Sequence, residues 1–190
     1  MINPLELFQA DRSRAREAGD PMAAVCVLAT VDSDGQPEAR TLVLRQVEDS
    51  LALFIHQSSP KWQQIQRGAA ITTYWPSTEI QYRIRFTTQP VNPELVATSW
   101  QLRPDTPKRM DWFYDLQQPQ SSTVASREAL QQALDRLAVT EPLRAPTTAR
   151  GLLIEPSEFE RLDLNELSGL HDRRRYSLVN GAWQESILVP

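Results

Sequence analysis

The hydrophobic positions of this chain follow a helical spacing at its start and a strand spacing after that. Over residues 3–18, Leu5, Phe8 and Arg12 fall on neighbouring turns, which predicts an N-terminal amphipathic helix. The apolar run MAAVCVLATV then predicts a strand, DSDGQP a turn, and ARTLVLRQV a second strand. After the turn EDS, the run LALFIHQ predicts a third strand. Short connections between three successive strands indicate an antiparallel meander.

The rest of the chain mixes short helices with further strands. SSPKWQQIQRG predicts a helix that is capped by Ser59 and ends at Gly68, and NPELVATSWQL and ASREALQQALDRLAV predict two more. Residues 103–120 are rich in Pro and Gln and are expected to be irregular. AAITTYW, EIQYRIRFTTQPV and GLLIEPSEFERLDL predict strands, and the C-terminal stretch predicts a hairpin closed at Asn180 and Gly181. The chain is therefore expected to be α+β and mainly β, an antiparallel barrel with flanking helices.

Composition narrows the class of protein. The 190 residues are 41% hydrophobic and 23% charged, which is typical of one soluble domain over residues 1–190. The net charge of −4 argues against a general nucleic-acid binder. One cysteine, Cys26, and two histidines exclude a disulfide framework and argue against a metal site. No apolar stretch has membrane-spanning length and no cleavage signal is recognisable, so we expect a cytoplasmic protein away from membranes.

Two arginine- and lysine-bearing segments could hold an anion. In SSPK, residues 58–61, a helix start lies beside Lys61, which suits a phosphate, although a plain capped helix explains the same pattern. In ARTLVLR, Arg40 and Arg45 carry guanidinium groups that bind phosphate through paired hydrogen bonds. Strict alternation puts these two arginines on opposite faces, so they could meet one ligand only through a bulge or with Arg45 at the end of the strand. The alternative is that the two arginines simply mark the exposed ends of a strand.

Two further clusters carry polar side chains on strands. Gln81, Arg83 and Arg85 share one face, which is usually a solvated face, but a glutamine amide can also bind the edge of a ring. In HDRRRY, His171 shares a face with Arg173 and an arginine two positions later. Such charges can simply protect a sheet edge from aggregation. The cluster lacks the interleaved aromatic residues of a single-strand binder, so we expect no nucleic-acid partner.

Taken in order, the segments ARTLVLR, FIHQSSPK, EIQYRI, QSS and LHDRRRY…W…LVP resemble the pyridoxamine 5′-phosphate oxidase family of FMN-binding split barrels. Order and approximate spacing agree from Ala23 to Pro190, with residues 151–190 as a family-like C-terminal segment, and the chain looks closest to a bacterial side branch. The resemblance implies an antiparallel six-stranded split β-barrel. It also implies a homodimer that holds FMN at the subunit interface.

The resemblance implies the following FMN contacts: Arg40, Thr41, Leu42, Val43, Leu44, Arg45, His56, Ser59, Lys61, Gln81, Gln120, Ser121 and Arg173. Arg40 and Lys61 would hold the phosphate, and Gln81 would face the flavin ring. Gln120 and Ser121 would come from the partner subunit, and Arg173 would contact the polar edge of the ring.

The resemblance also implies residues that act on substrate. His171 and Arg45 would be catalytic, and Arg103 and His171 would hold a small phosphorylated or anionic substrate. Three positions depart from the family pattern: Gly169 replaces an arginine, Ser99 or Trp100 stands at a phosphate-binding tyrosine, and Pro107 stands near a serine. The leading hypothesis is therefore an FMN-dependent oxidase of B6 phosphates with oxygen as acceptor. The alternatives are an FMN-dependent reductase that uses NAD(P)H and a non-catalytic flavin-binding module.

Overall fold

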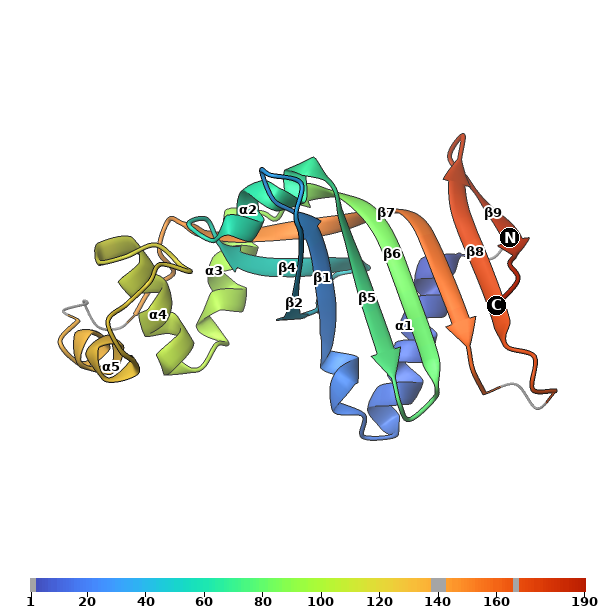
Figure 1. Cartoon of the computed structure of the whole chain (residues 1–190), viewed down its shortest axis with the longest axis horizontal. Coiled ribbons are helices and arrows are strands. Elements are labelled where there is room, and N and C mark those ends of the chain that lie inside the picture. Colours follow the sequence, from blue (N-terminus) through green and yellow to red (C-terminus); the bar gives the residue numbers. More distant parts are fainter. Residues whose placement is uncertain (1–2, 138–142, 166–167) are drawn as a thin grey trace.

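A computed structural model describes residues 3–137, 143–165 and 168–190 (Figure 1). Its strands are β1 (Val25–Val31), β2 (Pro37–Val43), β3 (Arg45–Val47), β4 (Ser50–His56), β5 (Ala69–Trp75), β6 (Ile80–Pro90), β7 (Ala149–Asp163), β8 (Asp172–Val179) and β9 (Ala182–Ile187). Its helices are α1 (Pro4–Glu17), α2 (Pro60–Gln64), α3 (Pro93–Gln101), α4 (Asp105–Leu116) and α5 (Arg127–Asp135), with 3-10 turns at Pro21–Ala24 and Ile65–Arg67. The last positions of the helix predicted over 125–139 lie outside the described residues.

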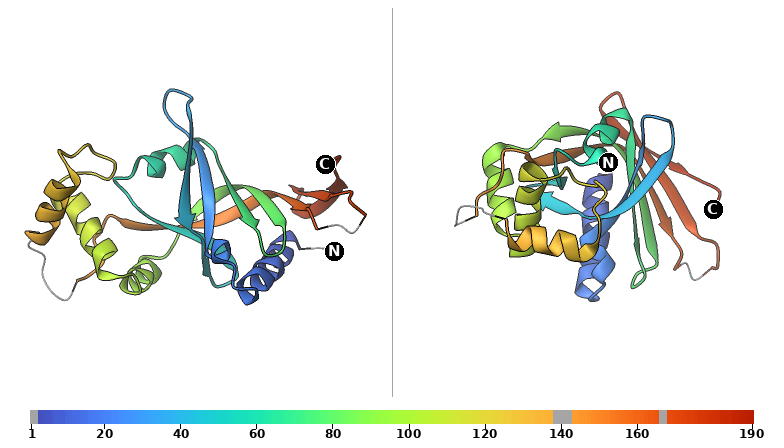
Figure 2. Two further views of the ribbon diagram at one scale, coloured as in Figure 1. Left: turned by 60° about the horizontal axis from the view of Figure 1, so that its bottom comes forward. Right: turned by 60° about the vertical axis from the view of Figure 1, so that its left-hand side comes forward.

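The strands form one antiparallel sheet that curls back on itself. Its order is β2-β1-β5-β6-β7-β4-β3, and the hairpin β8–β9 extends from β7. The two ends of this order, β2 and β3, are consecutive in the chain, with only Leu44 between them. The sheet therefore closes around a core as a half-barrel, which confirms the predicted α+β antiparallel split-barrel fold (Figures 1 and 2). The C-terminal hairpin β8–β9 confirms the prediction from the sequence, and together with the short β3 it brings the six strands of the expected barrel to nine in the described part of the chain.

Strand β7 serves two parts of the sheet. Its first half, residues 149–154, pairs with β4, and its second half, residues 158–163, pairs with β8. Between them the pairing with β6 shifts register next to Arg85, which marks a β-bulge. Because a bulge bends its strand and increases the local twist, β7 leaves the barrel there and carries the hairpin outward (Figure 1).

The core forms on the concave face of the sheet, where α1 packs. Helix α1 begins at Pro4 because the Asn3 side chain accepts a hydrogen bond from Leu5 N at 3.1 Å, and its last turn carries basic residues that suit the helix dipole. Phe8 is fully buried, and its ring lies 5.0 Å from the Tyr82 ring of β6 and 5.4 Å from the Trp75 ring of β5. Burial of a side chain of this size stabilises the fold by roughly 1.5–3 kcal/mol.

A buried carboxylate fixes α1 to two strands. Asp11 accepts hydrogen bonds from Tyr82 Oη at 2.6 Å and from Arg161 Nε at 2.7 Å, and it pairs with Arg14. Burial acts to raise the pKa of Asp11, but the hydrogen bonds from Arg161, Tyr82 and Arg14 outweigh it and lower the pKa. The carboxylate therefore stays charged and ties α1 to β6 and β7.

A buried guanidinium holds the place where the sheet closes. Arg12 Nε donates to the carbonyl of Ala23 at 2.7 Å, and Nη2 donates to the carbonyl of Leu44 at 2.6 Å. The backbone N–H of Leu44 in turn donates to the carbonyl of Ala24 at 3.0 Å. Burial lowers the pKa of Arg12 to about 10, so the side chain remains a cation at neutral pH.

The structure corrects one expectation from the sequence, for residues 103–120. The prediction that residues 103–120 are irregular is wrong, because α4 spans Asp105–Leu116. Pro107 lies in the first turn of α4, where a proline removes no intrahelical hydrogen bond. Helices α3, α4 and α5 lie together at one end of the molecule (Figure 1). Among the described residues, no helix is both long and apolar enough to span a membrane.

We expect Arg12→Met to lower the free energy of unfolding by about 2–4 kcal/mol, because it leaves the buried carbonyls of Ala23 and Leu44 without their donor. Urea unfolding followed by circular dichroism measures this change. Arg16→Met alters an exposed arginine of the same helix and is the matched control. Equal stability of the two variants would contradict the assigned role of Arg12.

Candidate functional site

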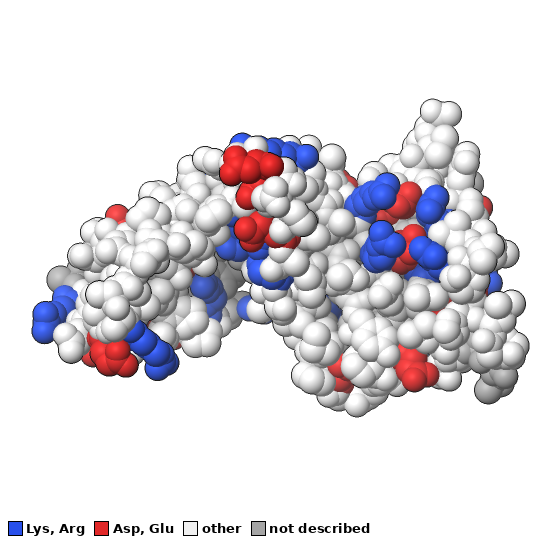
Figure 3. All heavy atoms as spheres, viewed as in Figure 1, with Lys and Arg blue, Asp and Glu red and all other residues white. Residues whose placement is uncertain are grey.

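A pocket of about 480 Å³ separates the barrel from the helical end of the molecule. Strands β2, β4 and β7 form one wall, which includes residues Thr41 to Val43, and α3 and α4 form the other. In the space-filling view, basic side chains are visible in the hollow between these two parts (Figure 3). The walls combine apolar and aromatic side chains with a few charged groups, which is typical of a small-molecule site.

Basic residues gather at the barrel side of the pocket. Lys61, Arg45 and Arg150 line it. The ammonium group of Lys61 donates to Ser59 Oγ and lies 3.4 Å from Gln120 Oε1. Burial lowers the pKa of Lys61, and the nearby charge of Arg40 lowers it further. Within the part of the chain that the structure describes, no carboxylate lies within ion-pair distance of Lys61, so an anion here would relieve the repulsion between two cations.

Arg40 lies beside this group and is held by buried polar side chains. Its guanidinium donates to Thr30 Oγ1 and to Gln64 Oε1 at 2.9 Å, and Glu38 lies at 3.3 Å. Thr30 Oγ1 also donates to Gln64 Oε1 at 2.9 Å. These contacts point Arg40 toward α2, the helix that carries Lys61.

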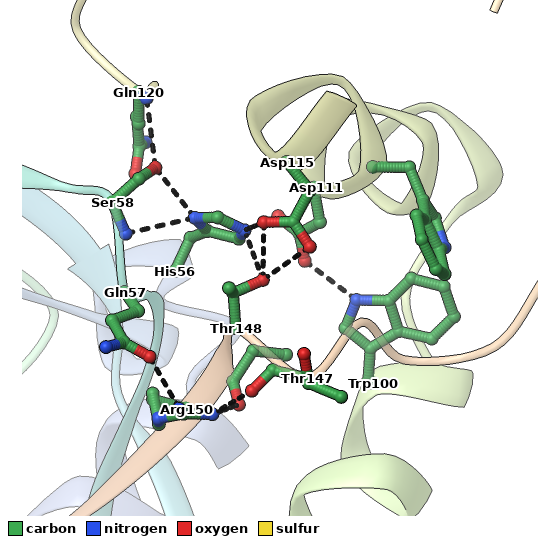
Figure 4. A network of polar contacts seen from close by, with 12 residues as sticks. His56, Gln57, Ser58, Trp100, Asp111, Asp115, Gln120, Thr147, Thr148 and Arg150 are labelled. Atoms are coloured by element: carbon green, nitrogen blue, oxygen red, sulfur yellow. Dashed lines mark hydrogen bonds and ion pairs between the residues drawn. The ribbon is translucent and has the colours of Figure 1, made fainter. Parts of the chain in front are cut away.

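His56 forms the centre of a polar network at the end of β4 (Figure 4). Its Nδ1 atom accepts a hydrogen bond from the backbone N–H of Ser58 at 3.2 Å and lies 2.8 Å from Ser58 Oγ. Its Nε2 atom lies 2.8 Å from Thr148 Oγ1 and 3.2 Å from Asp115 Oδ1. The acceptor role of Nδ1 assigns the proton to Nε2 in a neutral ring. Burial lowers the pKa of His56 even though nearby Asp111 and Asp115 act to raise it.

Helix α4 supplies three side chains to the site that the sequence did not reveal. Asp115 accepts from Thr148 Oγ1 at 2.7 Å, and Asp111 accepts from Trp100 Nε1 and from Arg103. The Tyr114 ring lies 5.2 Å from the His56 ring. The four-residue spacing of the two aspartates was the available signal, because positions i and i+4 share a helix face.

The predicted flavin contacts fall into two groups. The first group lies at or beside the pocket: Arg40, Thr41, Leu42, Val43, Arg45, His56, Ser59, Lys61 and Gln120, with Arg103 on the opposite wall. Leu44 is buried at the closure of the sheet, and exposed Ser121 follows Gln120 with a positive φ of 74°. Gln120 N donates to Ser58 Oγ of its own chain at 3.1 Å. The expected contribution of Gln120 and Ser121 to a partner subunit stays a prediction.

The second group lies on the outer face of the sheet, away from the pocket lining. Gln81 of β6 pairs with Leu162 of β7, and Leu162 pairs with Arg173 of β8, so the three residues form one row across the strands. Arg173 donates to Glu160 Oε1 at 2.9 Å, and Arg83 contacts the same oxygen at 3.2 Å. This alternation of basic and acidic side chains is visible over β6, β7 and β8 (Figure 3).

His171, the remaining predicted residue, lies just before β8 and is exposed. The structure therefore does not bring it to the pocket of its own chain. The role of His171 in binding substrate and in catalysis stays a prediction.

No family model matches the sequence. A curated protein from Pseudomonas putida (strain W619), named pyridoxine/pyridoxamine 5′-phosphate oxidase, is 35% identical over 175 residues that cover 88% of this chain and 79% of that protein. A protein of the same name from Leptospira biflexa is 30% identical over 195 residues, which cover 100% of this chain and 90% of the relative.

Solved structures share the fold. PhzG from Burkholderia lata 383, in complex with tetrahydrophenazine-1-carboxylic acid, aligns with a TM-score of 0.84 at 23% identity, covering 99% of this chain and 93% of that one. A pyridoxamine 5′-phosphate oxidase-related, FMN binding protein from Nostoc punctiforme PCC 73102 aligns with a TM-score of 0.77 at 22% identity, covering 100% of both chains.

The neutral, buried state of His56 predicts a stability that depends on pH. Its pKa lies below the ordinary value of about 6.5, so as the pH falls His56 is protonated in the unfolded chain before it is protonated in the folded chain. This penalty is absent above pH of about 6.5 and grows as the pH falls below it, at up to about 1.4 kcal/mol per pH unit.

The free energy of unfolding of the wild type is expected to fall as the pH is lowered from about 7.5 to 5.5. We expect it to fall less steeply in the His56→Gln variant, which has no imidazole at this position. Urea denaturation at each pH measures it. His171→Gln, which removes the exposed histidine, is the matched control. If unfolding free energy depends on pH equally steeply in the His56 variant and the wild type, the pKa of His56 is not lowered in the folded protein.

Proposed function

The chain belongs to the pyridoxine/pyridoxamine 5′-phosphate oxidase family, and from this premise we propose that it is an FMN-dependent oxidoreductase. The observation that supports the cofactor most directly is the juxtaposition of Lys61 and Arg40 beside a pocket along which the backbone of β2 runs. Lys61 has no carboxylate partner among the residues described, so the pair is suited to bind a phosphate group.

The residues present fit FMN. Lys61, Arg40 and Ser59 would hold the phosphate group, with Gln120 beside them. The neutral ring of His56 can donate or accept a hydrogen bond without adding a further charge. The extended backbone of Thr41–Val43, which lines the pocket, offers peptide groups to the polar edge of a flavin.

The residues around the pocket would bind and orient substrate. Bound FMN would supply the chemistry, accepting a hydride from the carbon that bears the amine or alcohol of the substrate, with oxygen as the final electron acceptor. Arg45 is exposed to the pocket, and its guanidinium would stabilise negative charge on a neighbouring ring. Val96, Trp100 and Met110 on the helical wall would exclude water and hold an aromatic substrate against the barrel.

A homodimer accounts for the second group of predicted flavin contacts. Gln81 and Arg173 share one row on the outer face of the sheet, and neither lines the pocket of its own chain. If both serve the flavin, they do so on a second copy. We therefore propose two equivalent sites per dimer, each built from the pocket of one subunit and the outer sheet face of the other.

An absorbance spectrum tests the proposal. The purified protein is titrated with FMN, and the holoprotein is then mixed without oxygen with pyridoxamine, pyridoxamine 5′-phosphate or NADPH in separate samples. Bleaching of the flavin by a pyridine compound supports the oxidase, and bleaching by NADPH alone supports a reductase instead. Failure to bind FMN would contradict the cofactor assignment.

We expect Lys61→Ala to weaken FMN binding by about 10–100-fold, because a charged hydrogen bond to phosphate is worth about 1.5–3 kcal/mol. Quenching of flavin fluorescence on titration gives the Kd. Arg67→Ala removes an exposed cation that follows the same helix and is the matched control. A similar loss in both variants would indicate general electrostatic attraction rather than a phosphate contact at Lys61.

Subunit mixing tests the shared site. Lys61→Ala and Arg173→Ala chains are each expected to bind FMN weakly, but a heterodimer of the two holds one wild-type site. Random exchange of equal amounts should therefore restore tight binding to about a quarter of the sites. Mixing Lys61→Ala with Arg40→Ala should restore none, because both residues belong to the same pocket. No recovery in the first mixture would contradict the shared site.

A further inference from the structure

Helix α4 carries a buried carboxylate into the part of the pocket where the resemblance implies a substrate phosphate. Asp111 is 3% exposed. Its Oδ2 atom accepts a hydrogen bond from Trp100 Nε1 at 2.7 Å and a second one from the Arg103 guanidinium. Arg103 is the cation expected to hold the substrate phosphate, and in this structure it is already paired.

The pairing changes what the helical wall can attract. Arg103 and Asp111 together carry no net charge, and the Asp111 side chain, at 5% exposure, cannot turn out into solvent without breaking its bond to Trp100. A phosphate dianion that approached Arg103 would lie next to this carboxylate and be repelled by it. The phosphate would lose its hydrating water, and the neutralised Arg103 would compensate poorly for that loss.

Other groups on the same wall do not replace the missing charge. Pro107 has neither a backbone N–H nor a side-chain donor, and it lines the wall near the place of an expected serine. Lys108 lies over the Trp100 ring at 5.7 Å and 3.8 Å from Asp105, and it is not part of the pocket lining. Ser99 and Thr106 add hydroxyl groups, which suit a neutral alcohol.

The two ends of the pocket therefore differ in charge. The barrel side carries Lys61, Arg45 and Arg150, none of which has a carboxylate partner in the described ranges. The helical side carries one neutralised arginine among apolar and aromatic side chains. One phosphate fits the first end, and an uncharged ring fits the second.

We propose that Asp111 makes this pocket selective for phosphate-free substrates, namely pyridine-ring compounds of the pyridoxine or pyridoxamine type that carry a free hydroxymethyl group. The inference rests on the proposed function, because it concerns the substrate side of the same site. Asp111 acts as a specificity-determining residue by occupying Arg103, and Ser99 and Thr106 are placed to receive the free hydroxymethyl group.

Binding of two unreactive probes tests the inference. 4-Deoxypyridoxine and its 5′-phosphate lack the hydroxyl or amino group on the carbon that would be oxidised, and they differ from each other only in the phosphate. Each is titrated into the FMN-loaded protein by calorimetry. We expect the phosphate-free probe to bind at least as tightly as the phosphorylated one. Tighter binding of the phosphorylated probe, by about tenfold or more, or binding of neither probe, would overturn the inference.

Substitutions test whether Asp111 causes the preference for the phosphate-free probe. Asp111→Asn keeps the shape and an acceptor for Trp100 but frees the charge of Arg103, so the phosphorylated probe should bind about tenfold or more tightly. Asp105→Asn, at the exposed start of the same helix, is the matched control and should change neither Kd. An Asp111→Asn variant that folds and leaves the affinity for the phosphorylated probe unchanged would overturn the role of Asp111.

A second variant covers the case in which Asp111→Asn does not fold. In the presence of Asp111, Arg103→Gln should leave the affinity for the phosphorylated probe within about twofold. A loss of tenfold or more would show that Arg103 holds phosphate in spite of Asp111 and would overturn the inference. Failure of the proposed function is distinguished by flavin uptake, which is measured before either probe is added.

Discussion

Leu44 joins the two ends of the curled sheet, and the buried guanidinium of Arg12 holds it there through its carbonyl oxygen. A curled sheet needs its first and last strands to meet, and in this chain a single residue separates β2 from β3. A helix side chain links the two places, since Arg12 also donates to the carbonyl of Ala23 just before β1. Helix α1 therefore contributes to the core and also holds together the two backbone segments where the sheet closes.

The position of the pocket follows from this closure. Because β2 turns into β3 at Leu44, the backbone before it and Arg45 after it face the same hollow as the ends of β4 and the beginning of β7. The α3–α4 unit then completes the second wall, and Thr148, at the entrance to β7, bonds to both His56 and Asp115. The sheet thus positions the groups of one wall, while the helices α3 and α4 supply the other.

The distribution of charge around the pocket favours binding of an anion at the cost of the stability of the folded protein. Lys61 and Arg40 repel each other, and burial of Lys61 adds to the cost, so an anion bound between them would stabilise the arrangement. On the opposite wall the charge of Arg103 is satisfied internally by Asp111. A ligand that is anionic at one end and neutral at the other matches both walls.

The sequence by itself determined most of the order of helices and strands, the barrel class and two of the cations that line the pocket, Lys61 and Arg45, because these depend on local periodicity and on motifs a few residues long. The helix within residues 103–120 escaped prediction because the prolines of this stretch indicate breaks, although Pro107 falls in the first turn of α4, where a proline is tolerated. Phe113 of α4 and Trp100 of α3 are buried, and this packing depends on the tertiary structure. Tertiary structure alone decided which charges meet. Asp111 reaches Arg103 only when α3 and α4 pack together, and strand pairing aligns Gln81 with Arg173 although 91 positions separate them. Contacts between distant segments depend on how the sheet curls, and periodicity along the chain carries no information about that curvature.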